Sequence, residues 1–167
     1  MKQTAIVYGS TSGNCENIAN KIAAALGIDS ANVFTASQLD ASKIASFDNL
    51  LLGSSTWGSG DLQDEWYDGI EVIKSSDLSG KTVAVFGCGD SSGFSTTYCD
   101  AMGTLYEAAK AAGADMIGAV STDGYTFDDS TAVADGKFVG LALDEDNESH
   151  LTDTRIAAWV AEIQPSL

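Results

Sequence analysis

The sequence predicts an α/β protein whose five-stranded parallel sheet is covered by helices on both faces. Short apolar runs rich in strand-forming residues alternate with segments whose apolar residues recur at helical spacing. Parallel strands need crossover connections, and right-handed crossovers place helices on each side of the sheet. Because 167 residues lie within the usual size of one domain, we expect a single domain over residues 1–167.

The first strand and the first helix flank a loop of glycine and hydroxyl residues. Residues 3–8 (QTAIVY) predict a buried strand, which the segment Gly9-Ser10-Thr11-Ser12-Gly13 ends. We expect Ser12 to cap the helix that follows and Gly27 to stop it. The next elements are a weak strand, a short helix and a strong strand, expected at residues 31–35, 41–47 and 50–53.

The second half of the chain continues the alternation and interrupts its last strand. A third helix is indicated by the apolar spacing of Leu62, Trp66, Ile70 and Ile73. The fourth strand, the fourth helix and the last helix are expected at residues 81–86, 102–112 and 156–163. The fifth strand starts at residues 115–120 and resumes at 138–143, so the polar segment between them is predicted to be an insertion over residues 121–137.

The chain is strongly acidic, with 24 acids against 8 bases and a net charge of −16. This balance excludes nucleic acid and anionic membranes as expected partners. Such a field favours rapid, salt-sensitive encounter with a positively charged protein surface, and solubility alone is an equally good explanation.

The cysteines and the N-terminal segment point to the cytoplasm. Cys15, Cys88 and Cys99 are odd in number and form no Cys-x-x-Cys pair, so we expect neither disulfides nor zinc. The sequence shows no signal-peptide pattern and no apolar stretch of membrane-spanning length, so we expect a cytoplasmic protein with no membrane insertion.

Three loops follow the carboxyl ends of the first, third and fourth strands, where sheets of this type bind ligands. They span residues 10–15, 54–61 and 87–99, and none contains Lys or Arg. The first offers hydroxyls and backbone amides at a helix N-terminus, which bind phosphate without a counter-cation. It lacks the Gly-Lys-Ser/Thr of triphosphatases and the Gly-x-Gly-x-x-Gly of dinucleotide sites, which disfavours triphosphates and NAD. An ordinary strand-to-helix turn is the alternative.

Each of the other two loops carries one aromatic residue among small polar ones. Trp57 lies between Thr56 and Gly58, and Phe94 lies between Gly93 and Ser95. Two aromatic side chains that face one another suit a flat ring between them, although both residues could instead cap the ends of the core. A flat ring joined to a single phosphate indicates FMN.

Four segments in order carry a resemblance to a known family: GSTSGNCENIA, STWGSGDLQDEW, GCGDSSGF and GKFVGLALDEDNESHLTD. Together they resemble a flavodoxin over nearly the whole chain, and the interrupted last strand resembles the long-chain subclass. The resemblance implies the strand order 2-1-3-4-5, non-covalently bound FMN and a monomer.

The resemblance also implies the cofactor contacts, residue by residue. The FMN phosphate would lie on Ser10, Thr11, Ser12, Gly13, Asn14 and Cys15, and Cys15 departs from the usual Thr. Trp57 would cover one flavin face, and Phe94, in place of the usual Tyr, the other. The peptide after Gly58 would turn its carbonyl toward flavin N5. The other implied residues are Asp90, Thr97 and Cys99 at the pyrimidine edge, Ser55, Thr56 and Asp146 near the ribityl chain or phosphate, and Cys88 and Gly89 in the third loop.

The expected function is one-electron transfer at low potential. A reduced flavin in an acidic, cation-free site resists becoming an anion, so we expect a strongly reducing hydroquinone and a stabilised neutral semiquinone. The implied partners are basic redox proteins, such as a flavodoxin/ferredoxin–NADP reductase, and low-potential electron acceptors. Asp64, Asp68 and Glu71 fall at helical spacing and would form their docking surface, or only a solvated face.

Two other functions are possible for this fold class. An FMN-dependent NAD(P)H:quinone-type reductase would need a substrate pocket over the flavin, usually at a dimer interface, and the sequence has no motif for one. A receiver-type signalling module would need acids after the first strand, where this chain has Gly9-Ser10-Thr11. His150 is the only histidine and is expected to be solvated or to cap the last helix, so we assign no catalytic and no metal-ligating residue.

Overall fold

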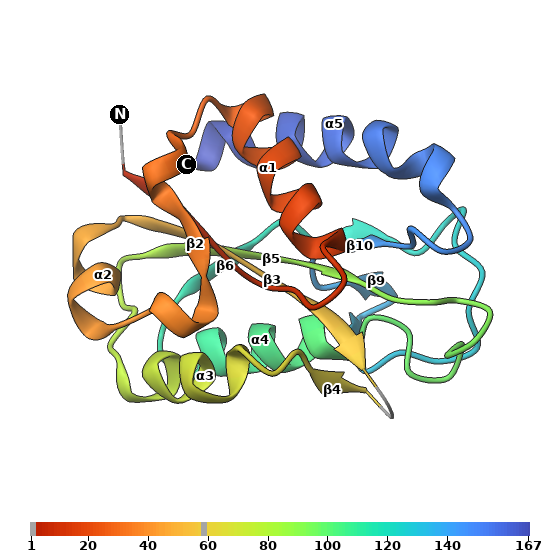
Figure 1. The fold of residues 1–167 in the computed structure, drawn as a ribbon, viewed down its shortest axis with the longest axis horizontal. Coiled ribbons are helices and arrows are strands. Elements are labelled where there is room, and N and C mark those ends of the chain that lie inside the picture. The colour runs from red at the N-terminus through yellow and green to blue at the C-terminus, as the bar shows by residue number, and fades with distance from the viewer. Residues whose placement is uncertain (1–2, 58–59) are drawn as a thin grey trace.

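The computed structural model describes residues 3–57 and 60–167, and its main sheet has the expected strand order (Figure 1). The parallel strands β2, β1, β3 and β5 lie side by side in that order. Their bounds are Val33–Thr35, Thr4–Gly9, Asn49–Trp57 and Thr82–Cys88. The parallel pairing aligns the carboxyl ends of β1, β3 and β5 at one edge of the sheet.

Two short strands share the last position in the sheet. β6 (Asp115–Ile117) pairs with the first half of β5, and β10 (Leu141–Leu143) pairs with its second half. The predicted interruption of the fifth strand is therefore confirmed.

The interrupting segment forms a small antiparallel sheet of its own. Its strands β7 (Val120–Ser121) and β8 (Val133–Ala134) both pair with β9 (Lys137–Phe138). The prediction that Val120 and Phe138 belong to the main sheet is wrong, because these residues pair with each other in the smaller sheet.

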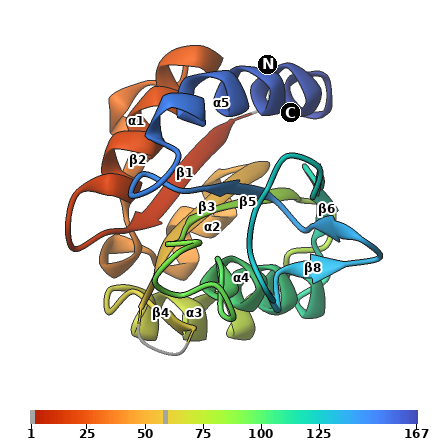
Figure 2. The ribbon, with the colours of Figure 1, turned by 90° about the vertical axis from the view of Figure 1, so that its right-hand side faces the viewer.

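Helices cover both faces of the main sheet (Figures 1 and 2). One face carries α1 and α5, and the other carries α3 and α4, with the short α2 beside β2. Their bounds are Asn14–Leu26, Thr152–Ile163, Trp66–Ser75, Asp100–Ala111 and Ala41–Ser46. Along β3, Leu51 packs on the α1 side, while Leu50 and Leu52 pack on the α3 side. This alternation is why the strands show continuous apolar runs.

Two predicted helix starts are wrong. The residue that precedes α1 is Gly13, in a left-handed conformation with φ of +90°, and no side chain caps the helix, so Ser12 does not do so. Leu62 belongs to β4 (Asp61–Leu62), which pairs antiparallel with the end of β3, and α3 begins only at Trp66. The short 3-10 helices are η1 (Ser30–Asn32), η2 (Ala36–Gln38), η3 (Ser149–Leu151) and η4 (Gln164–Ser166).

The described residues include no helix that is both long enough and apolar enough to span a bilayer.

Candidate functional site

The loop between β1 and α1 presents unpaired backbone amides at the start of a helix. The Ser10 Oγ accepts the Gly13 N–H at 3.1 Å and so closes the loop. Within the part of the chain that the structure describes, the amides of Thr11, Ser12, Asn14 and Cys15 donate to no protein acceptor. These free donors and the positive end of the α1 dipole form an anion-binding cradle.

Gln63, which directly follows β4, supports this cradle. Its side chain is buried, and its Nε2 donates to Thr11 Oγ1 at 3.0 Å. Its backbone N–H donates to Ser54 Oγ at 3.1 Å, which joins the first loop to the end of β3. A Cβ at Gly9 would lie 2.5 Å from Gln63 Oε1 and 2.8 Å from the Trp66 ring, so any side chain there would displace Gln63 or Trp66. Gln63 was not among the predicted site residues, although it lies within the DLQDEW segment.

Trp57 and Phe94 are large aromatic side chains that remain exposed, with 44% and 50% of their surface accessible. Both line one pocket at the carboxyl edge of the sheet. Trp57 is the last residue of β3, so its predicted place in a loop is wrong. Its Nε1 donates to Ser55 Oγ at 2.9 Å, which fixes the indole ring. Two exposed aromatics on one pocket are the arrangement that a planar ligand requires.

Most of the site residues that the sequence indicates line this pocket. Its lining residues are Ser12, Asn14, Ser55, Thr56, Trp57, Cys88, Gly89, Asp90, Phe94, Glu145 and Asp146. Ser10, Thr11 and Gly13 lie in the adjoining loop, whereas Cys15 and Cys99 are buried and Thr97 does not line the pocket. Gly58 lies outside the described residues. Glu145 is a lining residue that the sequence analysis missed.

The carboxylate of Asp90 bonds to its own loop and to the loop after β10. Its Oδ1 accepts the Gly93 N–H and the Asn147 Nδ2, each at 2.8 Å. These two hydrogen bonds, the Gly93 amide first, hold the pKa of the Asp90 carboxyl below its ordinary value. The Asp90 N–H has no acceptor among the described residues, so this backbone amide is free to bind a ligand.

The Cys99 amide is a second free donor close to Gly89. Cys99 has a left-handed backbone with φ of +55°, and its N–H meets no acceptor in the described ranges. A Cβ at Gly89 would lie 2.9 Å from the Cys99 nitrogen, so glycine keeps this region open. Strained backbone of this kind is concentrated at binding sites.

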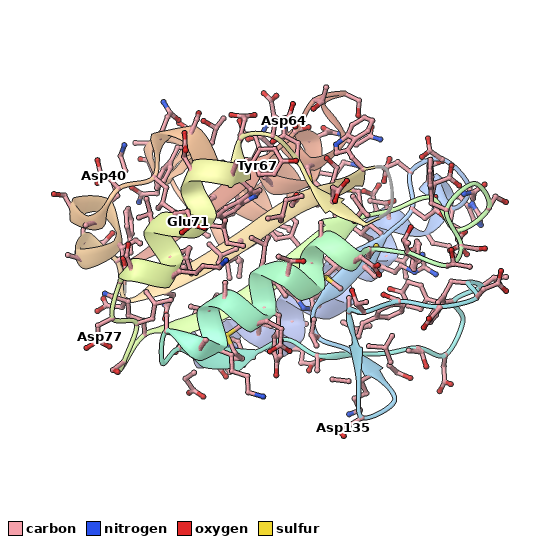
Figure 3. The ribbon with its side chains drawn as sticks, turned by 90° about the horizontal axis from the view of Figure 1, so that it is seen from below. Asp40, Asp64, Tyr67, Glu71, Asp77 and Asp135 are labelled. Carbon is pink, nitrogen blue, oxygen red and sulfur yellow. The ribbon has the colours of Figure 1, made fainter. Side chains whose placement is uncertain are left out.

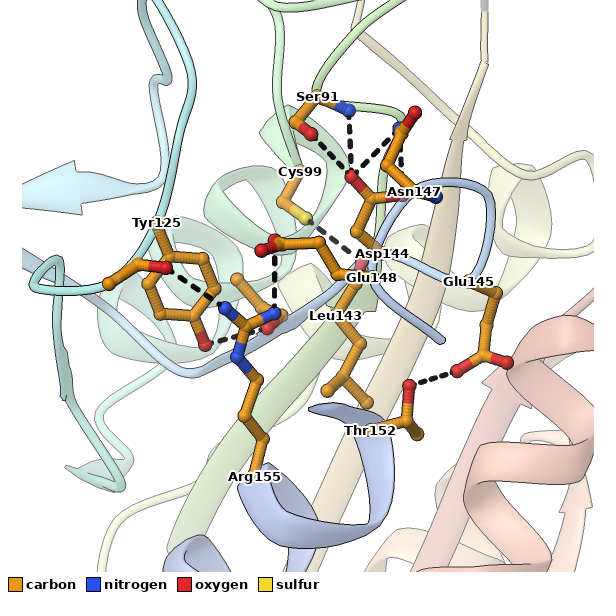
Figure 4. Close-up of polar contacts among 12 residues, drawn as sticks. Ser91, Cys99, Tyr125, Leu143, Asp144, Glu145, Asn147, Glu148, Thr152 and Arg155 are labelled. Carbon is orange, nitrogen blue, oxygen red and sulfur yellow. Dashed lines mark hydrogen bonds and ion pairs between the residues drawn. The ribbon is translucent and has the colours of Figure 1, made fainter. Parts of the chain in front are cut away.

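A buried carboxylate, that of Asp144, holds two loops of the pocket together (Figure 4). It accepts the Ser91 N–H at 3.0 Å, the Ser91 hydroxyl at 2.5 Å and the Asn147 N–H at 2.9 Å. The loop after β5 is thereby fixed to the loop after β10. Asp144 is the first residue of the acidic run DEDN, and nothing in that run indicates that this one carboxylate is buried.

Asp146 lies in a negative environment. Partial burial raises the pKa of its carboxyl, and the neighbouring charges of Asp90, Asp144 and Glu145 raise it further. Within the described residues, the lining of the pocket contains carboxylates and no cation.

A family model described as Flavodoxin matches residues 6–159 of this chain. The chain belongs to the flavodoxin family. It is 41% identical to a flavodoxin from Picosynechococcus sp., with 99% of this chain and 98% of the relative covered. It is also 41% identical to Flavodoxin 1 of Azotobacter vinelandii, with 98% of this chain and 97% of the relative covered.

Solved flavodoxin structures have the same fold. The crystal structure of a Fusobacterium nucleatum flavodoxin bound to flavin mononucleotide superposes with a TM-score of 0.92 at 30% identity, covering 100% of this chain and 99% of that one. Oxidised Flavodoxin 2 from Bacillus cereus has a TM-score of 0.73 at 26% identity, with 99% of each chain covered.

The acidic residues near α3 of this flavodoxin are arranged slightly differently from the expectation (Figure 3). Asp68 and Glu71 lie on α3, but Asp64 lies in the turn before it. All three are exposed, and so is Tyr67, with 58% of its surface accessible. His150 is exposed in η3, next to the start of α5.

Proposed function

We propose that this chain binds FMN non-covalently in the pocket and carries electrons singly, at low potential, between partner proteins. The observation that supports this most is the amide cradle of residues 10–15, which opens beside two exposed aromatics on one pocket. A phosphate and a planar ring have separate, adjacent places there.

The donors in the pocket fit FMN. Backbone amides suit a phosphate dianion where no Lys or Arg is present. The free amides of Asp90 and Cys99 suit the carbonyl acceptors at one edge of a flavin ring, and Trp57 and Phe94 suit its two faces. The Fusobacterium nucleatum relative, bound to flavin mononucleotide, supports the same assignment.

Bound FMN would supply the redox chemistry, cycling between semiquinone and hydroquinone. The residues of the chain would set its potential. The carboxylates of Asp90, Glu145 and Asp146 line the pocket, and the net charge of the chain is −16. Negative charge close to the ring raises the free energy of an anionic reduced flavin, so the protein would be a strong reductant.

An absorption spectrum of the purified protein, with identification of the released flavin, tests cofactor binding. We expect one FMN per chain and two separate one-electron steps in a redox titration. Direct two-electron reduction would contradict the proposal. Steady NAD(P)H oxidation by the protein alone would favour the quinone-type reductase instead.

The acidic surface of Asp64, Asp68 and Glu71 is our proposed docking site for basic redox partners. We expect the D64N/D68N/E71Q variant to be reduced about tenfold more slowly by a ferredoxin/flavodoxin–NADP reductase at low salt. Stopped-flow kinetics measure this rate. The difference should vanish at high salt, where exposed charges are screened.

A charge-matched control removes three exposed acids elsewhere. D115N/D135N/E162Q changes the net charge by the same amount, and all three side chains are exposed. If the control slows the reaction as much as the first variant, net charge and not a local docking surface sets the rate.

A further inference from the structure

Two buried thiols touch at the base of the pocket. The Sγ atoms of Cys15 and Cys88 are 3.6 Å apart, and the side chains are 0% and 6% exposed. Cys15 lies in the first turn of α1, directly after the phosphate loop, and Cys88 is the last residue of β5. The pair therefore joins the cradle to the strand that carries the third loop.

We infer that Cys15 and Cys88 are a peroxide-oxidisable pair whose disulfide weakens ligand binding at the phosphate loop. The formation of the disulfide does not depend on the identity of the cofactor. Its effect on FMN rests on the function proposed above.

The pocket gives a small oxidant access to one member of the pair. Cys88 lines the pocket, whereas Cys15 is fully buried and does not. The Cys88 sulfur attacks one oxygen of hydrogen peroxide, the O–O bond breaks, and hydroxide leaves with the thiol proton as water. The Cys15 sulfur then displaces the hydroxyl of the resulting sulfenic acid, which forms the S–S bond and releases a second water. Two thiols lose two electrons, and one peroxide becomes two waters.

The geometry explains why this bond would disturb the cradle. An S–S bond is about 2.05 Å long, so the sulfurs must approach each other by about 1.5 Å. The strand β5 is held by β3 on one side and by β6 and β10 on the other. The first turn of α1 lacks a side-chain cap and is the freer partner, and it carries the Asn14 and Cys15 amides. Movement of these donors would loosen their hold on a phosphate.

The reduced pair is protected under ordinary conditions. The hydrogen bond with Cys15, and then burial, hold the pKa of the Cys88 thiol well above its ordinary value. Little thiolate is present at neutral pH, so oxidation is slow. A ligand in the pocket covers Cys88 and slows it further.

Peptide mapping of the full-length protein after flavin removal tests the bond. After exposure to hydrogen peroxide and alkylation, we expect mass spectrometry to find a Cys15–Cys88 cross-link with Cys99 still alkylated. Cys99 is the internal control, because it is as buried as Cys15 but its sulfur lies against the Leu143 carbonyl. C15S and C88S should each lose the cross-link, and C99S should keep it. No cross-link, or equal oxidation of Cys99, would overturn the inference.

Fluorescence titration with FMN tests the consequence. We expect the oxidised protein to bind FMN at least tenfold more weakly than the reduced protein, and dithiothreitol to restore the affinity. Equal affinities would overturn the coupling to the phosphate loop. If the reduced protein itself failed to bind FMN, the proposed function would be wrong, and the peptide map would still decide whether the thiols pair. Far-UV circular dichroism of C15S and C88S shows whether each variant is folded.

Discussion

The carboxylates of Asp90 and Asp146 line the same pocket, but in their ionised forms they have opposite effects on the stability of the folded state. Hydrogen bonds from Gly93 and Asn147 lower the pKa of the Asp90 carboxyl, whereas burial and three neighbouring carboxylates raise that of Asp146. An ionised group with a lowered pKa stabilises the folded state, and one with a raised pKa destabilises it. A sequence pattern cannot separate the two, because both are acids in polar loops.

Asparagine at each position should reveal this difference. At pH 7, D90N should lower the free energy of unfolding by about 1 kcal/mol, and D146N should raise it by less than about 1 kcal/mol. The D90N effect is present above the unfolded pKa of 3.8 and fades as pH falls through the lower folded pKa. The D146N effect is complete above the raised folded pKa and fades as pH falls to 3.8. Urea unfolding of the flavin-free protein at several pH values measures both, and effects of equal sign would contradict this account.

Tyr98 carries a buried hydroxyl that has no nitrogen or oxygen partner among the described residues. Its ring stacks on Phe127 with centroids 5.6 Å apart, so the packing does not need the hydroxyl. We expect Y98F to leave the free energy of unfolding unchanged or to raise it by about 1 kcal/mol. Y125F is the matched control, because the Tyr125 hydroxyl donates to the Ala142 carbonyl at 2.8 Å, and it should cost about 1 kcal/mol. Thermal unfolding compares them, and a larger loss in Y98F would show that its hydroxyl is bonded.

Sequence reasoning found the residues of the site that carry a local signal. Trp57 and Phe94 stood out because large aromatics are unusual among small polar residues, and both do line the pocket. Gln63 and Asp144 act through partners far along the chain, Thr11 and Ser91, which no spacing rule can reveal. Glu145 differs from its acidic neighbours only in where the fold places it.

At the scale of elements, Arg155 joins the last helix and the turn before it to the inserted segment, which lies about thirty residues earlier in the chain (Figure 4). It is the only arginine of the chain. From α5 its guanidinium lies 3.2 Å from Glu148 Oε1 and donates to the Gly124 carbonyl at 3.3 Å. It also stacks over the Tyr125 ring, 3.9 Å from the centroid. The inserted segment is therefore fixed to the last helix by one side chain.

Removal of the Arg155 cation should lower the free energy of unfolding more than removal of an exposed cation does. R155A leaves Glu148, which is only 19% exposed, without its partner, and should lower the free energy of unfolding by about 2–3 kcal/mol. R155K keeps the charge but loses the planar stack and should recover only part of this. K21A breaks the exposed Lys21–Asp153 pair and should cost less than about 1 kcal/mol. Urea denaturation ranks the three variants. Equal losses of stability in R155A and K21A would show that Arg155 contributes no more than an exposed cation.

Element types were predictable wherever the apolar pattern was long. The strands of the main sheet and the helices packed on it follow from that pattern, since each buries a whole face. The wrong predictions concern short elements, whose conformation is determined by tertiary contacts and not by the local sequence. Leu62 continues a helical spacing but pairs with Thr56 instead. The β8–β9 hairpin had one unused signal, the Asp135-Gly136 pair, whose positive φ values of 53° and 77° are those of a tight hairpin turn.

At the scale of the whole molecule, 24 acids against 8 bases create strong self-repulsion in the folded state. The compact form holds these charges closer together than the unfolded chain does. Salt therefore acts on folding as well as on docking. The Debye length falls from about 30 Å at 0.01 M salt to about 3 Å at 1 M.

Added sodium chloride should stabilise this protein. We expect the melting temperature of the flavin-free protein to rise by at least about 3 °C between 0.01 and 0.5 M salt, which corresponds to roughly 1 kcal/mol for a chain of this size. Differential scanning calorimetry measures the shift, with sucrose as an uncharged control. A melting temperature that is independent of salt would mean that the acids are too dispersed to repel one another.

The position of Asp144 late in the chain also implies that the cofactor is bound late in protein synthesis. The loop after β5 is held by Asp144, which follows β10, and β10 pairs with β5. A nascent chain emerges from its N-terminus, so β1, β3 and β5 leave the ribosome long before this carboxylate does. The pocket would stay open until residues 141–147 are free to dock. Flavin uptake would then mark a chain synthesised beyond β10, and chains terminated before β10 would reach the proteases without it.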